Sequence, residues 1–438
     1  MDYDETFSPV VRFSSIRALL AFAVENDMLV HQMDVVTAFL NGTLEEEIYM
    51  EQPEGYVLPG SEHLVCKLKR SLYGLKQSPR CWNTTLTEFL ESIHFNRNTA
   101  DQCVFSQIED GAPTTVAVYV DDLVILAKTS EKMDTTKQML AKRFKMKDLG
   151  EIHYCIGITI ERDIDKKCFL MHQKQYILDV VEKYGLSEAN TVSTPADVNV
   201  QLKKDDGISK PVDTTCYQSM VGSLLYTAVA TRPDIAQAVG AVAKFCSKPC
   251  EAHLTAVKRI LRYLKGTADL GLKFVKSGDG ELVGYSDADW AEDVDDRHST
   301  SGNLFLMAGG PVSWLSKKQP IVALSTSEAE YVALSMATQE AVWIRRFLSS
   351  LTATELQKPT VIMEDNQGTI AIARNPIAHA RTKHIDIRYH YIREAVQKGI
   401  IDLQYCPTEA MVADFLTKPL TRSFRDFSLS DGTFNLRI

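Results

Sequence analysis

A short run of the chain, TTVAVYVDDLVILAKT at residues 114–129, constrains the fold more than any other feature. Two apolar arms rich in β-branched residues flank a pair of aspartates, and this pattern predicts a β-hairpin with Asp121 and Asp122 at its tip. A second apolar strand, MLVHQMDV, is expected to end at Asp34. Carboxylates carried side by side on strands repel each other, and a divalent cation converts that repulsion into binding. Spacing alone leaves the interpretation open, because an Asp pair at a hairpin tip is also typical of an ordinary turn.

The length of 438 residues favours two or three domains, because one hydrophobic core rarely serves so long a chain. A polar stretch broken by Pro and Gly, residues 191–213, is the best linker candidate. Before it, apolar spacing predicts a strand pair at 151–163 and 166–173 and helices at 13–26, 85–95 and 131–144. After it, helices are expected near 216–229, 233–246 and 251–264.

The last third of the chain has the pattern of a mixed α/β domain. Three successive strands are expected at 281–290, 301–315 and 319–325, followed by a long helix at 327–351. Strands and helices then alternate, at 359–365, 368–375, 386–397 and 400–406, with a short helix around Asp414.

Four acidic residues fall in four different elements of this part: Asp287, Glu330, Asp365 and Asp414. Each alone is typical of a solvated surface or a helix cap. They could converge on one pair of metal ions, but the sequence does not show that they do.

Composition narrows the class of protein. Apolar residues make up 45% of the chain and charged residues 24%, as in an ordinary globular protein. No apolar run has the length needed to span a bilayer, and the acidic start MDYDETFSPVVRF lacks the layout of a secretory signal. We therefore expect an intracellular protein without a membrane partner. The net charge of −9 argues weakly against nucleic-acid binding, although local patches decide that property and basic residues gather at 67–80 and 374–393.

The nine cysteines are an odd number, are scattered and form no CxxC motif, so a disulfide framework is not expected. Cys246, Cys250 and His253 could suggest a zinc site. No fourth ligand follows at a suitable spacing, and the segment has a helical pattern. We expect ordinary thiols here.

Several long blocks resemble one family. YVDDLVIL at 119–126 is similar to the YxDD hairpin of reverse transcriptases, and QMDVVTAFLNGTLEEEIYMEQPEGY at 32–56 resembles a block of copia-type elements. SLYGLKQSPRCW, DQCVF and MKDLGEIHYCIGI follow in the order of that family. The chain thus resembles the reverse transcriptase plus RNase H portion of a copia-type (Pseudoviridae) retrotransposon Pol polyprotein.

That resemblance implies roles for the first set of residues. Asp34 and Asp121 would hold catalytic metals in a polymerase palm, and Asp122 would support the hairpin. Phe39 falls at the aromatic steric gate that crowds a ribose 2′-hydroxyl, although it could equally be a core residue of the same strand. Tyr73 and Gly74 fall in the block under the incoming nucleotide, where a glycine allows close approach.

The C-terminal blocks YSDADW, STSEAEYVALS, EDNQGTIAI and VADFLTK resemble RNase H domains. The resemblance implies that Asp287, Glu330, Asp365 and Asp414 hold metal ions there and are catalytic. The family pattern favours Glu330 over Glu328, and Asp289 is expected to be a solvated neighbour. No histidine shortly precedes Asp414, so His379 and His384 are the candidates to assist the site, with a surface role as the alternative.

The expected fold is α+β. A reverse-transcriptase palm with partial fingers and the start of a thumb would span 1–198, and a helical thumb or connection 199–275. An RNase H-like α/β domain would span 276–421, and 422–438 would be a divergent tail. Each active site would use two Mg²⁺ ions, with Mn²⁺ as a substitute. Expected partners are an RNA template, a DNA primer, RNA–DNA hybrid, deoxynucleoside triphosphates and an integrase or other Pol-derived protein, in a cytoplasmic particle or the nucleus.

The resemblance also has gaps. The family has a fingers segment before ETFSPV, rich in Lys and Arg, that binds the triphosphate, and its absence here predicts impaired polymerase activity. The sequence after Lys418 departs from the family. Two alternatives are therefore kept: a truncated copy active only as an RNase H, and a catalytically silent relic that binds nucleic acid.

Overall fold

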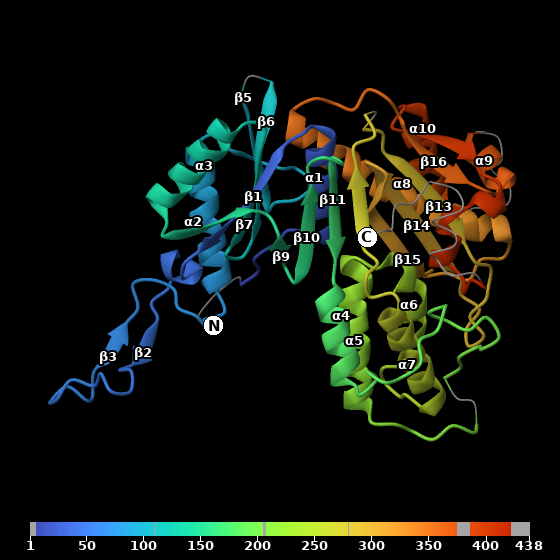
Figure 1. Cartoon of the computed structure of the whole chain (residues 1–438), viewed down its shortest axis with the longest axis horizontal. Helices are drawn as coiled ribbons and strands as arrows, with labels where there is room; N and C mark the ends of the chain where they lie inside the picture. Colours follow the sequence, from blue (N-terminus) through green and yellow to red (C-terminus); the bar gives the residue numbers. More distant parts are fainter. Residues whose placement is uncertain (1–5, 110, 205–206, 279, 375–385, 422–438) are drawn as a thin grey trace. The chain divides into compact units, whose positions relative to one another are not determined.

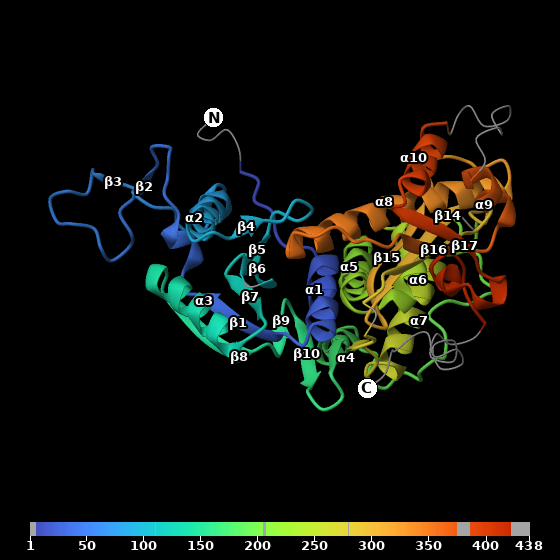
Figure 2. The same ribbon diagram turned by 90° about the horizontal axis from the view of Figure 1, so that it is seen from above.

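The computed structural model describes residues 6–109, 111–204, 207–278, 280–374 and 386–421, without the side chains of 386–389. The chain divides into two compact units (Figure 1 and Figure 2). Of the described residues, unit 1 comprises those within 6–12, 28–152 and 347–354, and unit 2 comprises those within 13–27, 153–346 and 355–421. The four domain ranges expected from the sequence stay a prediction, and the tail at 422–438 lies outside the described residues.

Unit 1 is built on a six-stranded antiparallel sheet with the order β4-β5-β6-β7-β1-β8. Its strands are β1 (Leu29–Val35), β4 (Asn96–Arg97), β5 (Val104–Glu109), β6 (Ala112–Tyr119), β7 (Asp122–Ala127) and β8 (Met146–Glu151). The unit also contains a short hairpin of β2 (Tyr49–Glu51) and β3 (Val65–Lys67), the 3-10 turn η1 (Ala38–Asn41), and the helices α2 (Ser78–Ser92) and α3 (Ser130–Arg143).

The core of unit 1 lies between this sheet and the apolar faces of α2 and α3. Met33 and Val35 on β1 and Leu123 and Ile125 on β7 pack into it, together with Trp82 of α2. Side chains alternate along a strand. Asp34 and Asp122 therefore point to the opposite face of the sheet, away from this core.

The hairpin of β6 and β7 differs from expectation in one detail. Asp122 is the first residue of β7 and pairs with Tyr119, so the turn consists of Val120 and Asp121 and only Asp121 lies at the tip. Val120 has a φ of 57°, a left-handed conformation that is strained for a β-branched residue. The indole N–H of Trp82 donates to the Val120 carbonyl oxygen at 2.6 Å. The SPRCW block therefore holds the turn of the YVDD block.

Unit 2 starts with α1 (Phe13–Glu25) and a four-stranded antiparallel sheet of order β12-β11-β10-β9. The strands are β9 (Tyr154–Cys155), β10 (Ile158–Asp163), β11 (Cys168–His172) and β12 (Leu272–Val275), and the expected strand pair is β10 and β11. Four helices pack around one apolar cluster. They are α4 (Lys174–Lys183), α5 (Thr214–Ala230), α6 (Ala236–Ala243, preceded by η2 at Pro233–Ile235) and α7 (Glu251–Gly266). The described part of the expected linker, 191–204 and 207–213, contains no helix or strand.

The C-terminal sheet of unit 2 has the order β15-β14-β13-β16-β17. Its strands are β13 (Val283–Ala288), β14 (Thr300–Met307), β15 (Gly310–Lys318), β16 (Thr360–Glu364) and β17 (Ile401–Tyr405). The first three are antiparallel, whereas β16 runs parallel to both β13 and β17. The remaining elements are α8 (Thr326–Thr352), α9 (Gln367–Arg374), α10 (Asp386–Gln397), η4 (Thr408–Ala410) and η5 (Val412–Leu416).

The expected third strand at 319–325 was wrong. Residues 301–315 instead contain parts of two strands, β14 and β15, which turn at Ala308 and Gly309. These two residues have φ values of 52° and 65°. Two consecutive left-handed residues form the tight turn that joins antiparallel strands, and the small side chains of the AGG sequence allow it. Among the described residues, no helix is long and apolar enough to cross a membrane.

Candidate active sites

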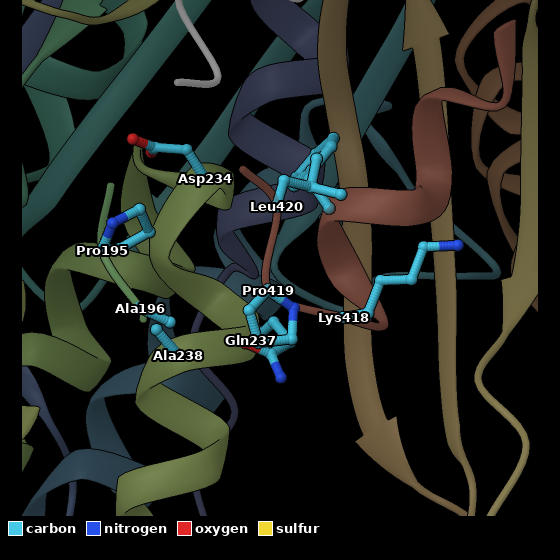
Figure 3. A pocket seen from close by; sticks show the side chains of 9 residues that line it. Pro195, Ala196, Asp234, Gln237, Ala238, Lys418, Pro419 and Leu420 are labelled. Carbon is cyan, nitrogen blue, oxygen red and sulfur yellow. The ribbon is translucent and has the colours of Figure 1, made fainter. Parts of the chain in front are cut away.

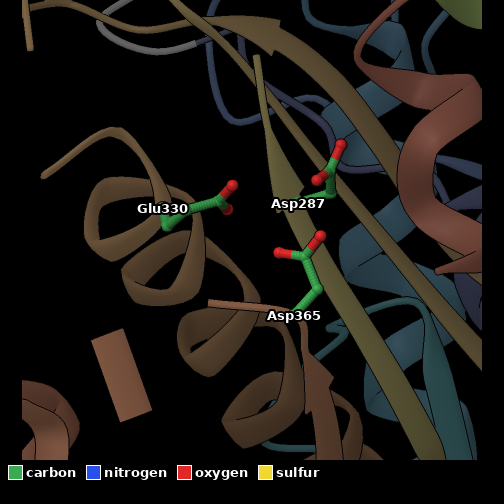
Figure 4. A group of neighbouring side chains, drawn as sticks. All are labelled: Asp287, Glu330 and Asp365. Atoms are coloured by element: carbon green, nitrogen blue, oxygen red, sulfur yellow. The ribbon is translucent and has the colours of Figure 1, made fainter. Parts of the chain in front are cut away.

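Three of the four predicted C-terminal acids meet in unit 2. The carboxylates of Asp287, Glu330 and Asp365 each offer an oxygen atom within 4.8 Å of the others. Figure 4 shows the three side chains pointing toward one another from a strand, a helix and a loop. Asp287 and Glu330 are buried, and Asp365 is half-buried.

The parallel pairing of β13 and β16 explains this meeting. Both strands run in the same direction in the middle of the sheet, so their carboxyl ends lie at one edge. Asp287 lies near the end of β13, and Asp365 directly follows β16. The first turns of α8 add Glu330. By contrast, the Glu328 carboxylate accepts the backbone N–H of Leu324 at 2.8 Å, which caps the chain before the helix.

Burial and mutual repulsion disfavour ionisation of these acids. Burial, and next the charge of Asp414, raises the pKa of Asp287 to about 7. Burial, followed by Glu364 and Asp287, raises the pKa of Glu330 well above its ordinary value. The Glu330 Oε2 atom is buried without a hydrogen-bond partner. An unpartnered buried carboxylate oxygen beside two further carboxylates suits a hard divalent cation with oxygen ligands, so these residues fit a divalent-cation site.

Asp414 is not one of the three acids whose oxygens meet within 4.8 Å. It lies on η5, and its Oδ1 atom is 2.9 Å from the Lys418 ammonium. Burial raises the pKa of Asp414, and the hydrogen bond from Lys418 opposes that rise. The charge of Asp414 is the second cause of the raised pKa of Asp287, and a side-chain hydrogen bond between the two acids lowers the pKa of Asp414, so Asp414 lies beside Asp287. Its role as a metal ligand stays a prediction.

Two further acids around the group were misjudged or missed. Asp289 was expected to be solvated, yet it is 6% exposed, and burial raises its pKa to about 6. The expectation was wrong because its backbone N–H donates to Thr300, which continues the pairing with β14. Glu364 is fully buried, and its charge is the strongest electrostatic influence on Glu330. The signal in the sequence for Glu364 was its position directly before Asp365. Adjacent residues of a strand usually face opposite sides of the sheet, so this position did not predict that both acids lie near Glu330.

The N-terminal aspartates meet in unit 1. Asp34 on β1 is the direct partner of Asp122 on β7, and Asp121 follows in the turn, where its carbonyl oxygen accepts the N–H of Val35 at 2.9 Å. Gln32 donates to the Asp122 carboxylate at 2.9 Å. Burial raises the pKa of Asp122, and the charges of Asp121 and Asp34 add to that rise. Within the described chain, Asp34, Asp121 and Asp122 do not form a group of three whose ligand oxygens all lie within 4.8 Å of one another, unlike the three acids of unit 2.

The predicted nucleotide-binding residues are neighbours of each other. The rings of Phe39 and Tyr73 lie 4.9 Å apart at 50°. Phe39 lies in η1, after β1 has ended, so its expected place on the strand of Asp34 was wrong. It still packs against the core of unit 1, so the gate and core interpretations are compatible, whereas Tyr73 is 58% exposed. Gly74 has a φ of 99°, a conformation that only glycine adopts readily, and no atom would contact a Cβ there. An exposed aromatic face beside open backbone could accept a flat ligand.

The expectation of ordinary thiols agrees with the surroundings of His253. His253 stacks on Phe245 at 3.8 Å, its Nε2 lies 2.8 Å from the Lys203 carbonyl oxygen, and its Nδ1 accepts the N–H of Cys250. Both ring nitrogens thus have partners: Nδ1 caps the start of α7, and Nε2 contacts the backbone at Lys203. His379 and His384 lie outside the described residues, as does much of the basic cluster at 374–393.

Comparison with known proteins gives this geometry a family context. Residues 1–198 match a family described as "Reverse transcriptase (RNA-dependent DNA polymerase)". The chain is 44% identical over 434 residues, or 97% of its length, to the retrovirus-related Pol polyprotein from transposon TNT 1-94 of Nicotiana tabacum. The chain is 41% identical, over 99% of its own length, to the retrovirus-related Pol polyprotein from transposon RE1 of Arabidopsis thaliana. These matches cover 32% and 29% of the two relatives, so the chain spans about a third of their length.

Two further likenesses extend the comparison. The chain is 35% identical over 309 residues to a putative transposon Ty5-1 protein of Saccharomyces cerevisiae. This alignment spans 70% of the present chain and the whole length of that relative. A solved structure of the foamy viral protease-reverse transcriptase in complex with RNA/DNA hybrid has a TM-score of 0.50 and 13% identity, over 87% of this chain and 44% of that one. At this identity the likeness concerns the fold alone, and it confirms the expected α+β class.

Proposed function

The chain belongs to the reverse transcriptase family and is similar to Pol polyproteins of copia-like transposons, and from this premise we propose that it copies RNA into DNA at Asp34, Asp121 and Asp122. In the same proposal, the chain degrades the RNA of the resulting hybrid with four further acids: Asp287, Glu330, Asp365 and Asp414. The observation that carries the proposal is the convergence of three carboxylates from three separate elements within 4.8 Å. Such a cluster destabilises a folded chain unless a cation meets it.

Both sites would use divalent magnesium, with manganese as a substitute. When bound, a metal pair activates the attacking oxygen and stabilises the leaving oxygen during displacement at phosphorus. In unit 2 the chain supplies the carboxylates and fixes their places by β13, β16 and α8. Thr408 donates to the Asp365 carboxylate at 2.7 Å, which orients that half-buried acid toward the group.

In unit 1, Asp34 and Asp121 would hold the metals and Asp122 would support them. The hydrogen bond from Gln32 keeps the Asp122 carboxylate on the face of the sheet that also carries Asp34. Trp82 holds the strained turn that presents Asp121. Phe39 would crowd the 2′-position of an incoming nucleotide, and its contact with Tyr73 would keep the ring in place.

The substrates would be an RNA template, a DNA primer, deoxynucleoside triphosphates and RNA–DNA hybrid. The hybrid would be recognised by its shape and its 2′-hydroxyls rather than by base sequence. Integrase or another Pol-derived protein is a proposed partner, and a cytoplasmic particle or the nucleus the proposed location, on family resemblance alone.

Two assays on the purified chain test the proposal. Primer extension on poly(rA) with oligo(dT) and Mg²⁺ tests unit 1, and cleavage of a labelled RNA–DNA hybrid tests unit 2. We expect both activities to require a divalent cation. Hybrid cleavage without primer extension would limit the function to the nuclease, whereas hybrid binding with neither activity would replace the proposal by a silent nucleic-acid-binding role.

A further inference from the structure

We propose that the consecutive residues Thr417 and Lys418 are positioning residues that fix two acids from different elements, Asp287 on β13 and Asp414 on η5. The inference rests on the proposed function of this site and adds residues that hold its carboxylates from behind. Neither residue is assigned to contact the substrate or a metal ion.

Thr417 contacts Asp287 directly. It is 1% exposed, and its hydroxyl donates to the Asp287 Oδ2 atom. The same hydroxyl oxygen lies 3.0 Å from the carbonyl oxygen of Asp414, at the end of η5. One hydroxyl thus joins the strand that carries the first acid to the turn that carries the second. The donation also gives the buried Asp287 carboxylate a hydrogen-bond partner.

A glycine makes this contact sterically feasible. Gly302 on β14 is the direct cross-strand partner of Asp287. A Cβ at Gly302 would lie 2.8 Å from Thr417 Cγ2 and 2.9 Å from Leu416 Cβ, closer than packed carbon atoms approach. The end of η5 therefore occupies the space that a side chain opposite Asp287 would otherwise fill.

Lys418 forms an ion pair with the second acid, Asp414. Its ammonium lies 2.9 Å from Asp414 Oδ1, and the side chains of this ion pair are 36% and 15% exposed. Lys418 also lines a small hollow with Gln237, Ala238 and Pro419, and Figure 3 shows its side chain extending away from Pro195 and Ala196. The ion pair itself therefore restrains the Asp414 carboxylate.

Together the two contacts oppose the repulsion within the acid cluster. Like charges held together move apart unless neighbouring groups restrain them. A hydroxyl and an ammonium on adjacent residues restrain one acid each, without occupying the position among Asp287, Glu330 and Asp365. We therefore expect their loss to weaken cation binding or slow the reaction while the fold persists.

Cation binding by the whole chain tests the Thr417 contact. A background carrying both Asp34→Asn and Asp121→Asn removes the two proposed metal ligands of the other site, and Mn²⁺ alone is titrated by calorimetry. Thr417→Val, which keeps the shape but loses the hydroxyl, is expected to raise the Kd for Mn²⁺ about tenfold, and Thr417→Ser to stay within about twofold of the parent. Should Thr417→Val melt below the assay temperature, Thr417→Ala takes its place.

Kinetics test the Lys418 contact. Lys418→Met is expected to lower kcat for hybrid cleavage about tenfold with an unchanged KM for the hybrid, and Lys418→Arg to stay within about threefold. Primer extension at Mg²⁺ saturation serves as the control for folding. Lys418→Met and Lys418→Arg are each made as single substitutions in the otherwise unaltered chain, and neither should change it.

The outcomes separate this inference from the proposed function. An unchanged Mn²⁺ Kd in Thr417→Val would overturn the role of Thr417, and an unchanged kcat in Lys418→Met that of Lys418. If the unaltered chain cleaves no hybrid while Thr417→Val still weakens Mn²⁺ binding, the nuclease proposal fails and the positioning of Asp287 stands.

Discussion

Asp34 and Asp122 lie directly opposite each other on the antiparallel strands β1 and β7. Facing residues in such a pair have Cβ atoms about 4.5–5.5 Å apart, so the two carboxylates share one face of the sheet. Gln32, two residues before Asp34 on that face, already donates to Asp122. Asp121 lies in the turn and lacks such a bond in the described contacts. The Asp122 carboxylate is therefore supported by Gln32, whereas the carboxylates of Asp34 and Asp121 are available to a cation.

Substitutions of the three aspartates should therefore differ in effect. Asp34→Asn and Asp121→Asn are expected to lower primer extension by about 10²-fold or more, because each removes a charge that holds a metal. Asp122→Asn should cost only about tenfold, since the amide can still contact Gln32. Steady-state rates with saturating Mg²⁺ measure the series. Hybrid cleavage is the control, and an equal loss in all three variants would contradict the division of roles.

In the C-terminal group, Asp287→Asn should reduce hybrid cleavage by about 10²-fold or more. The same change should raise the melting temperature of the metal-free chain at pH 8, because it removes one of several buried, repelling charges. Scanning calorimetry in EDTA tests stability. Asp402→Asn, on β17 outside the group, is the matched control. Unchanged hybrid cleavage in Asp287→Asn would contradict the assignment of Asp287 to the nuclease site.

The stability of the metal-free chain should depend on pH in a defined direction. Asp287 and Asp289 have raised pKa values of about 7 and about 6, above the ordinary 3.8. The folded state therefore binds more protons than the unfolded state between about pH 4 and 7, and stability falls as pH rises through this window. Adding Mg²⁺ should raise the melting temperature more at pH 8 than at pH 5.5. Equal shifts at both values would contradict the prediction.

Phe39 should control the choice of sugar. Phe39→Val is expected to raise incorporation of ribonucleotides relative to deoxyribonucleotides by about tenfold, because the smaller side chain admits the 2′-hydroxyl. The ratio of kcat/KM values for the two nucleotides measures the effect. Tyr49→Val removes another aromatic side chain of unit 1, one that is exposed on β2, and should leave the ratio unchanged.

Trp82 should matter for stability through the turn it holds. Trp82→Phe removes the donor to the Val120 carbonyl oxygen and shortens a buried ring that packs at 5.2 Å from Phe144. We expect a loss of about 1–3 kcal/mol in the free energy of unfolding, measured by urea denaturation. Phe89→Leu, which changes a partly buried ring that also packs on Phe144 but makes no contact with Val120, should cost less.

Local patterns in the sequence were sufficient to predict most of the helices and strands. Apolar runs predicted β1 and, with their β-branched residues, the hairpin of β6 and β7, and helical spacing predicted α1, α3 and α8. Short-range preferences decide such elements, because each segment has one face suited to burial. The strand expected at 319–325 failed because the two-residue turn at Ala308 and Gly309 had already placed two strands upstream.

The positions of the acids relative to one another depend on tertiary structure. The sequence determined that Asp287, Glu330 and Asp365 would end or begin separate elements, but only the parallel pairing of β13 and β16 brought two of them to one edge. The burial of Glu364 and Asp289 and the hydroxyl contact of Thr417 also appear only in the folded chain. Contacts between residues more than a hundred positions apart, such as Thr417 and Asp287, arise from packing, and no local pattern encodes them.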